Sequence, residues 1–289
     1  MTPCVWITGA GGLIGHALPS VPSAGFGPVP LMRADLDLTD AAAVAARFRR
    51  DAPDAVIHCA GLTRNPACTA DPALARRLNV GVTRHLAGLC AAAAVPLVFF
   101  STDLVFDGRK GASYVESDPV NPQGVYAETK AEAERVVLAA PGNLVLRTSL
   151  NYGRSPTGER AFNEELVRAW QAGRTTPLFT DEFRRPLAAE VTARATWELV
   201  TQLLRPAAAE RPAGLYHLAG TERLSRWQLG ELIAARHPEA GPRLLPASLE
   251  DYSGPPRPPD CSLDCSRVQA RLSFPLPRFT DWLAARPLP

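Results

Sequence analysis

The sequence predicts an α/β protein built on a doubly wound parallel sheet, with a smaller mixed lobe in the C-terminal half. Three observations predict this architecture. Short apolar runs alternate with helical segments over the first 150 residues, as in βαβ units with right-handed crossovers. A glycine-rich turn directly follows the first apolar run, Cys4–Thr8. After residue 150 the alternation becomes irregular, which predicts a separate, smaller lobe.

The predicted domain boundaries follow from this change of pattern. Residues 1–150 are expected to form a dinucleotide-binding domain, to which residues 187–222 return. Residues 151–186 and 223–289 are expected to form the smaller, substrate-binding lobe. A chain of 289 residues is long enough for one large domain and such a lobe.

Composition and charge narrow the class of partner. The formal net charge is +2 and there is no basic run, so we expect no nucleic-acid partner. No apolar stretch approaches the ~20 residues of a membrane span, and we expect neither an anchor nor a signal peptide. The six cysteines are scattered without a CxxC pair, which indicates reduced thiols. These features predict a cytoplasmic protein without a metal site.

The glycine-rich turn over residues 9–15, GAGGLIG, has the spacing GxxGxxG and opens a helix. One glycine is needed for the tight turn, one for the approach of the backbone to a pyrophosphate, and one for close helix–strand packing. We therefore predict a Rossmann domain in which the helix N-terminus binds a dinucleotide. The predicted contacts of this turn are Gly9, Gly12, Leu13, Ile14 and Gly15.

The second predicted strand, residues 28–33, ends at Arg33, and Asp35 follows two residues later. An acidic residue at this place binds the ribose 2′-hydroxyl of NAD, whereas an arginine favours the 2′-phosphate of NADP. We favour NADP (NADPH) over NAD because Arg33 is at the tip of the strand. Asp37 and Leu38 are expected to flank the adenine.

The third predicted strand, residues 54–61, is apolar up to an exit of small residues. Cys59, Ala60 and Gly61 at this exit are small enough to lie against a cofactor. His58 lies within the strand and is expected to be a hydrogen-bonded core residue rather than a ligand.

A long helix is predicted over residues 71–94, with Asn79 near its middle. Asparagine lowers helix propensity, so its side chain is expected to hydrogen-bond a buried group. We assign Asn79 to the cofactor-binding residues.

A buried strand ends in the hydroxyl pair Ser101 and Thr102, and a later helix carries Tyr126 and Lys130. Positions i and i+4 share one face of a helix, so the phenol and the ammonium point the same way. A neutral phenol beside a cation is a candidate proton donor with a lowered pKa. The glycine turn, Cys59–Gly61, the pair Ser101 and Thr102, and Ser149 all occupy the carboxyl edge of the sheet, where ligands bind.

In the second half of the chain, Arg184 and Arg185 have two readings. The pair could clamp a diphosphate, or it could be a solvated pair on the surface. Residues 261–272 near the C-terminus are expected to be helical.

Several segments in order along nearly the whole chain resemble the extended short-chain dehydrogenases/reductases, and within them the dTDP-4-dehydrorhamnose reductase family. The segments are GAGGLIG, DLDLTD, DAVIHCAG, Asn79, STDLVFDG, YAETK and LRTS. The resemblance implies hydride transfer from NAD(P)H to the C4 ketone of a 4-keto-6-deoxy nucleotide sugar.

The resemblance also implies roles for three residues. Tyr126 would protonate the developing alkoxide, Lys130 would bind the nicotinamide ribose and keep the phenol acidic, and Thr102 would hydrogen-bond the substrate oxygen. The predicted substrate-facing residues are Thr63, Asp103, Arg184 and Arg185. Leu104 stands where related dehydratases carry a second carboxylate, which favours simple reduction.

Two departures leave the substrate open. Leu150 replaces a tryptophan that is usual in the family, and Arg184 lies in an altered DQxGxPT segment. A reductase of a different carbonyl compound is therefore an alternative. A second alternative is an NADP-binding regulatory subunit without its own reaction, resembling the β subunit of methionine adenosyltransferase. A homodimer is a further possibility that the sequence does not decide.

Overall fold

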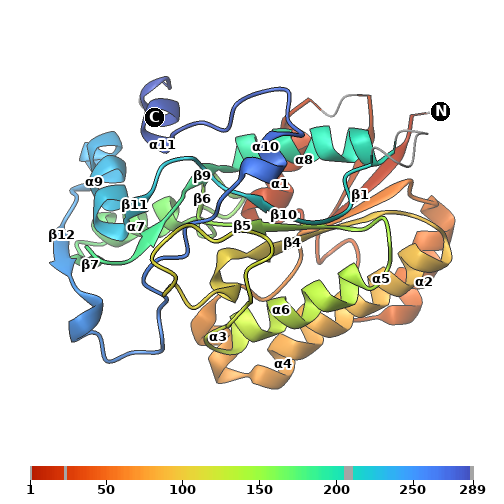
Figure 1. Cartoon of the computed structure of the whole chain (residues 1–289), viewed down its shortest axis with the longest axis horizontal. Helices are drawn as coiled ribbons and strands as arrows, with labels where there is room; N and C mark the ends of the chain where they lie inside the picture. The colour runs from red at the N-terminus through yellow and green to blue at the C-terminus, as the bar shows by residue number, and fades with distance from the viewer. Residues whose placement is uncertain (1, 23–24, 205–210, 287–289) are drawn as a thin grey trace.

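The computed structural model describes residues 2–22, 25–204 and 211–286, and Figure 1 shows their arrangement. A six-stranded sheet in the order β10-β5-β4-β3-β1-β2 forms the centre, and each pair of neighbouring strands is parallel. Its strands are β1 (Cys4–Thr8), β2 (Gly27–Leu31), β3 (Ala55–His58), β4 (Leu97–Thr102), β5 (Leu144–Thr148) and β10 (Gly214–Leu218). The predicted doubly wound parallel sheet is confirmed.

Helices cover both faces of this sheet (Figure 1). The first face is covered by α1 (Leu13–Ser20) and α8 (Ala189–Leu203), and the second by α2 (Ala41–Asp51), α5 (Val82–Ala92) and α6 (Val125–Leu138). Successive side chains of a strand point to opposite faces. Val5 and Ile7 of β1 accordingly lie in the core under α1 and α8, while Trp6 lies in the core under α2 and α5.

The segment between β3 and β4 is helical almost throughout. It contains α3 (Asn65–Ala70), α4 (Pro72–Arg76), a π-helical turn (Arg77–Gly81) and then α5. The predicted long helix over 71–94 is therefore present, but it is interrupted by a π-turn at Asn79.

The smaller lobe is built from short paired strands and three helices. Its strands are β6 (Asn151–Tyr152), β7 (Thr176–Phe179), β8 (Phe183–Arg184), β9 (Leu187–Ala188), β11 (Leu224–Ser225) and β12 (Leu244–Ala247). Its helices are α7 (Phe162–Gln171), α9 (Arg226–Arg236) and α11 (Phe279–Ala284), which share an apolar core of their own around Trp170, Ile233 and Phe279. By contrast, β10 and α8 join the large sheet and its core. Leu263, Val268 and Leu276, predicted for the small lobe, also pack in that core, whereas β9 pairs with β6 of the small lobe, so the predicted boundaries stay a proposal.

The expectation of a helix over residues 261–272 is wrong in most of that range. Only α10 (Ser266–Gln269) is helical. Before it, the backbone is extended beside Tyr114, whose N–H donates to the Ser262 carbonyl at 2.8 Å. The Asp264 N–H in turn donates to the Tyr114 carbonyl at 2.8 Å. This pairing takes up backbone groups that a helix would have used.

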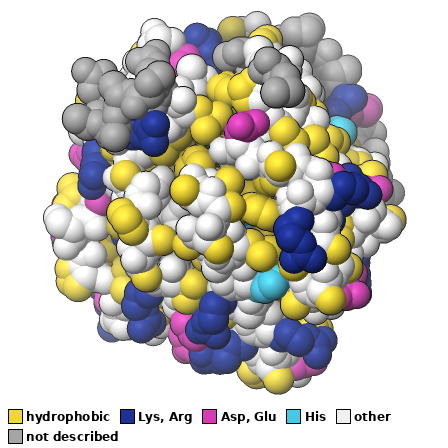
Figure 2. Space-filling model, turned by 90° about the vertical axis from the view of Figure 1, so that its right-hand side faces the viewer, with side chains coloured by type: hydrophobic (Ala, Val, Ile, Leu, Met, Phe, Trp, Pro, Cys, Tyr) yellow, Lys and Arg dark blue, Asp and Glu magenta, His cyan; other side chains and the backbone are white. Residues whose placement is uncertain are grey.

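The face opposite the small lobe is seen in Figure 2. Its basic side chains are scattered among acidic and apolar ones, which agrees with the net charge of +2. In the described part of the chain, no helix is long and apolar enough to cross a membrane.

Candidate active site

The glycine turn between β1 and α1 has the geometry that a dinucleotide-binding turn requires. Gly9 has a φ of 70°, and a Cβ there would lie 2.6 Å from the backbone nitrogen of Ala60. A Cβ at Gly15 would lie 2.3 Å from the Gly9 carbonyl oxygen. Each position therefore excludes a side chain, Gly9 for the turn and Gly15 for the packing of α1 against it.

The N-terminus of α1 is open for a ligand. Gly12 is its N-cap, and the helix has neither a side-chain cap nor an acidic residue in its first turn. A Cβ at Gly11 would meet no atom within 4 Å. Uncapped N–H groups at a helix N-terminus favour an anion such as a pyrophosphate.

The end of β2 presents Arg33 together with the exposed carboxylates of Asp35 and Asp37. Arg33 is exposed and makes no hydrogen bond or ion pair with the described residues, and it lies two residues beyond the observed end of β2. The Asp35 carboxylate accepts a hydrogen bond from the Met32 N–H at 2.9 Å. Asp37 accepts hydrogen bonds from the backbone and the hydroxyl of Thr39, which lower the pKa of its carboxyl.

The exit of β3 is held by Asn79. The Asn79 Oδ1 accepts from the Leu62 N–H at 2.7 Å, and its Nδ2 donates to the Leu62 carbonyl and the Thr129 hydroxyl, both at 3.0 Å. A Cβ at Gly61 would lie 3.0 Å from the Asn79 Oδ1. The prediction that Asn79 hydrogen-bonds a buried group is confirmed, and Asn79 fixes the backbone beside Cys59, Ala60 and Gly61.

His58 is a core residue, as predicted. Its Nδ1 lies 2.7 Å from the Thr8 hydroxyl, and its Nε2 lies 3.1 Å from the Thr83 hydroxyl. Burial, with a smaller effect of Lys130, lowers the pKa of His58 to about 3. The imidazole is therefore neutral near pH 7.

Thr102 and Tyr126 meet at the carboxyl end of β4. Their side chains interact electrostatically, and the Thr102 hydroxyl accepts from the Leu104 N–H at 3.2 Å. Burial raises the pKa of Tyr126 far above its usual range, and the Asp103 charge adds to this effect. The expectation of a lowered Tyr126 pKa is therefore wrong for the protein without ligand.

The Lys130 ammonium makes its contacts with β4. Lys130 is 6 % exposed, and its Nζ donates to the Phe100 carbonyl and lies 3.9 Å from the centre of the Phe99 ring. Burial lowers the pKa of Lys130 to about 8, although Glu134 opposes this shift. The ammonium is thus directed at the Phe100 carbonyl and the Phe99 ring.

The second hydroxyl of the strand end, Ser101, serves the packing below the site. It donates to the Glu134 Oε1, and Glu134 also accepts a bidentate pair of hydrogen bonds from Arg147, at 2.9 and 2.7 Å. This ion pair is buried, with side chains 5 % and 4 % exposed. Ser101 and Thr102 point to opposite sides of the sheet because they are adjacent in a strand.

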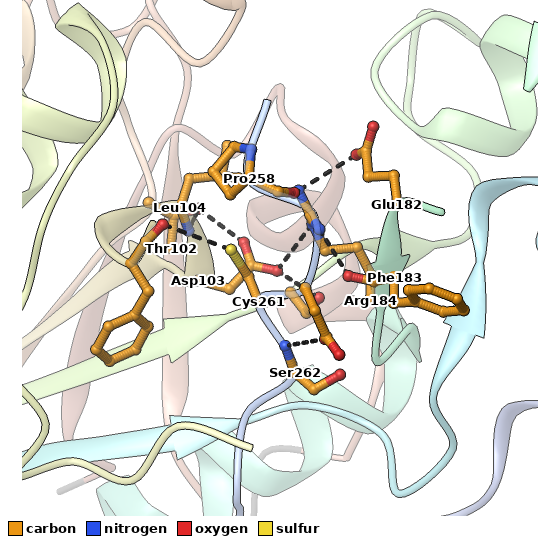
Figure 3. Close-up of polar contacts among 12 residues, drawn as sticks. Thr102, Asp103, Leu104, Glu182, Phe183, Arg184, Pro258, Cys261 and Ser262 are labelled. Carbon is orange, nitrogen blue, oxygen red and sulfur yellow. Dashed lines mark hydrogen bonds and ion pairs between the residues drawn. The ribbon is translucent and has the colours of Figure 1, made fainter. Parts of the chain in front are cut away.

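Asp103, beside Thr102, is bound within a buried network that Figure 3 shows. The Ser149 hydroxyl donates to Oδ2 at 2.6 Å, and the Thr102 hydroxyl donates to Oδ1 at 3.2 Å. The Arg184 Nε lies 3.6 Å from Oδ2. Burial raises the pKa of Asp103, whereas Arg184 and these hydrogen bonds oppose the shift.

The predicted arginine pair does not act side by side. Arg184 is 4 % exposed, so the reading as a solvated pair is wrong, and its guanidinium contacts Asp103, Glu182 and backbone carbonyls. Arg185 instead donates to the Ser113 hydroxyl at 3.0 Å. Thr63, the remaining residue of the predicted substrate group, is exposed after β3.

Two arginines that the sequence analysis missed complete this region. Arg226 and Arg257 both pair with Glu182, at 3.4 and 2.7 Å. Burial opposes the charge of Glu182, but Arg226, Arg184 and Arg257 together hold its pKa below the usual range. The Nη1 of Arg226 is buried and has no hydrogen-bond partner. In the sequence, only the Ser225 capping box, which places Arg226 at the start of α9, marked this position.

A hollow of about 450 Å³ lies beside Arg257, which contacts two of its lining residues. Arg257 lies over the rings of Phe179 and Tyr252, at 5.1 and 5.8 Å from their centres. The lining residues are Pro177, Phe179, Pro246, Ala247, Ser248, Asp251 and Tyr252. Among the described residues, no group of three or more His, Cys, Asp or Glu side chains could hold a metal ion.

The family model for the RmlD substrate binding domain matches residues 3–286 of the chain. A dTDP-4-dehydrorhamnose reductase from Streptomyces griseus is 34% identical over 218 residues, which are 74% of this chain and 70% of that protein. The chain belongs to this family. The predicted family is thereby confirmed, and so is the predicted class, an NAD(P)-dependent oxidoreductase.

Two further comparisons show that proteins with different functions are similar to this chain. The β subunit of methionine adenosyltransferase 2 from Xenopus tropicalis is 29% identical over 273 residues, 91% of this chain and 80% of that protein. The structure of a dTDP-4-dehydrorhamnose reductase from Bacillus anthracis in complex with NADP superposes with a TM-score of 0.85 and 22% identity. It covers 99% of this chain and 98% of that chain, which confirms the fold.

Proposed function

We propose that the protein is an NAD(P)H-dependent reductase of a 4-keto-6-deoxy nucleotide sugar. The observation that carries the proposal is the meeting of Thr102 and Tyr126, above Lys130, at the sheet edge that also holds the open glycine turn. Reduction of a carbonyl group needs a proton donor for its oxygen and a hydride donor for its carbon. Tyr126 meets the first need, and the glycine turn is suited to the cofactor that meets the second.

The residues at the sheet edge fit a nicotinamide dinucleotide. The turn at Gly9, Gly12 and Gly15, with Leu13 and Ile14, would hold the pyrophosphate, because α1 begins there without a cap. The remaining residues that would line the cofactor are Arg33, Asp37, Leu38, Cys59, Ala60, Gly61, Asn79, Tyr126 and Lys130. When bound, NADPH supplies the hydride.

NADP is proposed as the preferred cofactor because Arg33 is exposed and uncommitted, while Asp35 is bound to the Met32 N–H. Replacing Arg33 by Ala should weaken NADPH binding by about 10-fold or more, the scale of one charge-assisted hydrogen bond. NADH binding should change little. Melting shifts with each cofactor measure this difference, since a ligand stabilises the native state by mass action. If NADPH and NADH binding were weakened equally, Asp35 rather than Arg33 would be the residue that selects the cofactor.

Proton transfer is proposed for Tyr126. As negative charge grows on the carbonyl oxygen of the substrate, the phenol donates its proton and the oxygen becomes an alcohol. Thr102 is proposed to hydrogen-bond the same oxygen by sharing the proton that it donates to the Asp103 Oδ1. Lys130 would bind the ribose of the cofactor, which requires its ammonium to leave the Phe100 carbonyl.

The proposed substrate class rests on the arginines beside the site. Arg226 and Arg257 share the single carboxylate of Glu182, and the Arg226 Nη1 has no hydrogen-bond partner among the described residues. A diphosphate would supply the missing acceptors. The hollow beyond Arg257, with Phe179 and Tyr252, has the size and the aromatic walls that a nucleoside needs.

The experiment is NADPH oxidation by the purified protein with a panel of dTDP-4-keto-6-deoxyhexoses. We expect turnover with at least one member of the panel. No turnover with any sugar, together with tight NADPH binding, would reject the reductase. Turnover only with a different carbonyl compound would support the reduction but reject the proposed substrate.

A second candidate is a regulatory subunit that binds NADP without a reaction of its own. The relative from Xenopus tropicalis favours it, because it covers 91% of this chain and is named a β subunit. Co-purification with a methionine adenosyltransferase catalytic subunit, and a change in the activity of that subunit, would support this candidate. A homodimer is proposed for the protein alone, and light scattering tests it.

A further inference from the structure

A carboxylate lies directly beside the groups that would meet the reacting oxygen. Asp103 follows Thr102 in the chain and is 4 % exposed. Its Oδ1 accepts from the Thr102 hydroxyl, and its Oδ2 accepts from the Ser149 hydroxyl. A buried carboxylate has a large desolvation cost unless a cation and hydrogen bonds offset it.

The same carboxylate has two opposed effects on the proposed reaction. It orders the Thr102 hydroxyl, which is useful for positioning. It also places negative charge near Tyr126 and raises the pKa of that phenol. In reduction, further negative charge grows on the substrate oxygen, so an uncompensated Asp103 would oppose the step.

Arg184 supplies the compensating charge from the small lobe. Its Nε lies 3.6 Å from the Asp103 Oδ2, and its Nη2 lies 3.2 Å from the Glu182 Oε1. The same guanidinium donates to the carbonyls of Phe183 at 2.6 Å and Pro258 at 3.0 Å. Figure 3 shows it between the two carboxylates, with Pro258 on one side. The guanidinium is fixed and turned inward.

We propose that Arg184 is a positioning residue, the counter-ion that lets Asp103 order the Thr102 hydroxyl without opposing negative charge on the substrate oxygen. This inference rests on the proposed reductase function. It gives Arg184 a different role from the diphosphate clamp, for which Arg226 and Arg257 remain available.

The pair also links the two lobes. Arg184 belongs to β8 of the small lobe, whereas Asp103 directly follows β4 of the large sheet. Ser149, which follows β5, takes part through Oδ2. The Arg184 charge, which belongs to the small lobe, therefore compensates the Asp103 charge at the end of β4, where Thr102 lies.

The test is a double-mutant cycle with Arg184→Gln, Asp103→Asn and the double variant. At a pH high enough to keep Asp103 ionised in the variant, Arg184→Gln should lower kcat by about 10- to 100-fold. This is less than the ~10²–10³ for a lost oxyanion donor, because Arg184 acts through Asp103. The KM for the nucleotide sugar should change less than about 3-fold, because the substrate is bound elsewhere. The double variant should recover most of the lost kcat, since the uncompensated charge is gone, and Arg184→Lys should recover part of it.

A stability measurement tests the pair without any need for turnover. Without Arg184 the Asp103 charge is still less favourable in the native state, so the pKa of Asp103 rises further above its unfolded value. Stability from such a group is present at low pH and is lost as the pH rises through the folded-state pKa. The destabilisation by Arg184→Gln should therefore grow as the pH rises through the folded-state pKa of Asp103, and it should not grow in the double variant.

The control is Arg223→Gln, which removes the exposed arginine of the neighbouring Arg223–Asp260 pair. It should keep the wild-type kcat and show no pH-dependent destabilisation. The proposal is overturned by a raised KM with unchanged kcat, by a double variant as slow as Arg184→Gln, or by destabilisation independent of pH. If the wild type reduces no sugar, the reductase proposal fails by itself, and the pH-dependent cycle still decides whether Arg184 compensates Asp103.

Discussion

Burial largely determines the protonation of Lys130. Its pKa is lowered to about 8 by burial, and Glu134 limits the shift. The Tyr126 phenol, on the same helix, has a raised pKa for the same reason. Helix spacing brought the two residues to one face, but the direction of each side chain depends on the carbonyl of Phe100 and on the hydroxyl of Thr102.

Lys130 should give the reaction a pH dependence. We expect kcat/KM for NADPH to fall as the pH rises through about 8, because the free enzyme loses the Lys130 charge there. Folding stability should move the other way. The unfolded chain holds this proton up to its usual pKa of about 10.4, so the native state gains stability between pH 8 and that value. Activity falling while stability rises would exclude unfolding as the cause. A Lys130→Met variant should lack both transitions, and their persistence would assign them to another group.

The π-turn Arg77–Gly81 positions Asn79, whose side chain holds the backbone after β3. It carries Asn79 inward, where one side chain holds both backbone groups of Leu62 and the Thr129 hydroxyl of α6. π-turns are often found at functional sites. This turn couples the exit of β3 to the helix that carries Tyr126.

Replacing Asn79 by Ala should lower the free energy of unfolding by about 1–3 kcal/mol, since the Leu62 N–H and carbonyl lose their partner. NADPH affinity should fall as well, because the backbone at Gly61 is released. The matched control is Asn121→Ala, which removes one exposed hydrogen bond to Asp107 and should cost less than about 0.5 kcal/mol. Equal effects of the two variants on stability and affinity would show that Asn79 has no special role.

The regular elements could be predicted from the sequence because their signals are local. The apolar run of β1, the glycines at 9–15 and the capping box at Ser225 each specify structure within a few residues. Arg184 could not be assigned from the sequence, because its partners Asp103 and Pro258 are 81 and 74 residues away. The extended segment at Leu263 was missed for the same reason, since its pairing partner is Tyr114.

For the whole molecule, two buried histidines set the response to acid. His58 lies in the large sheet between two hydroxyls, and His217 of β10 lies beside Arg147. Burial lowers the pKa of His58 to about 3 and that of His217 to about 4. Both are neutral in the native state across the range in which an unfolded histidine takes up a proton.

Stability should therefore fall as the pH is lowered from about 6.5 toward 4, by up to about 1.4 kcal/mol per pH unit for each histidine. The sign follows because the unfolded state binds more protons than the native state in this window. Urea unfolding at pH 7, 6 and 5 measures it, before most carboxylates titrate. His217→Gln should remove part of the slope, whereas His16→Gln, at an exposed position, should leave it unchanged. A flat profile between pH 7 and 5 would contradict the burial of these imidazoles as neutral groups.

The large sheet supplies the cofactor edge, and the small lobe supplies the arginines and the hollow beside it. Their common point is the end of β4, where Thr102 meets Tyr126. The central claim is that Tyr126 gives the proton in a reduction at this point.

The most direct measurement is the rate of NADPH oxidation by Tyr126→Phe with the keto-sugar that the wild type reduces best. The phenyl ring keeps the packing but has no proton to give. Turnover should fall by about 100-fold or more, the scale of a lost general acid, while the melting shift with NADPH stays close to that of the wild type. A near-normal rate in this variant, with NADPH still bound, would contradict the account.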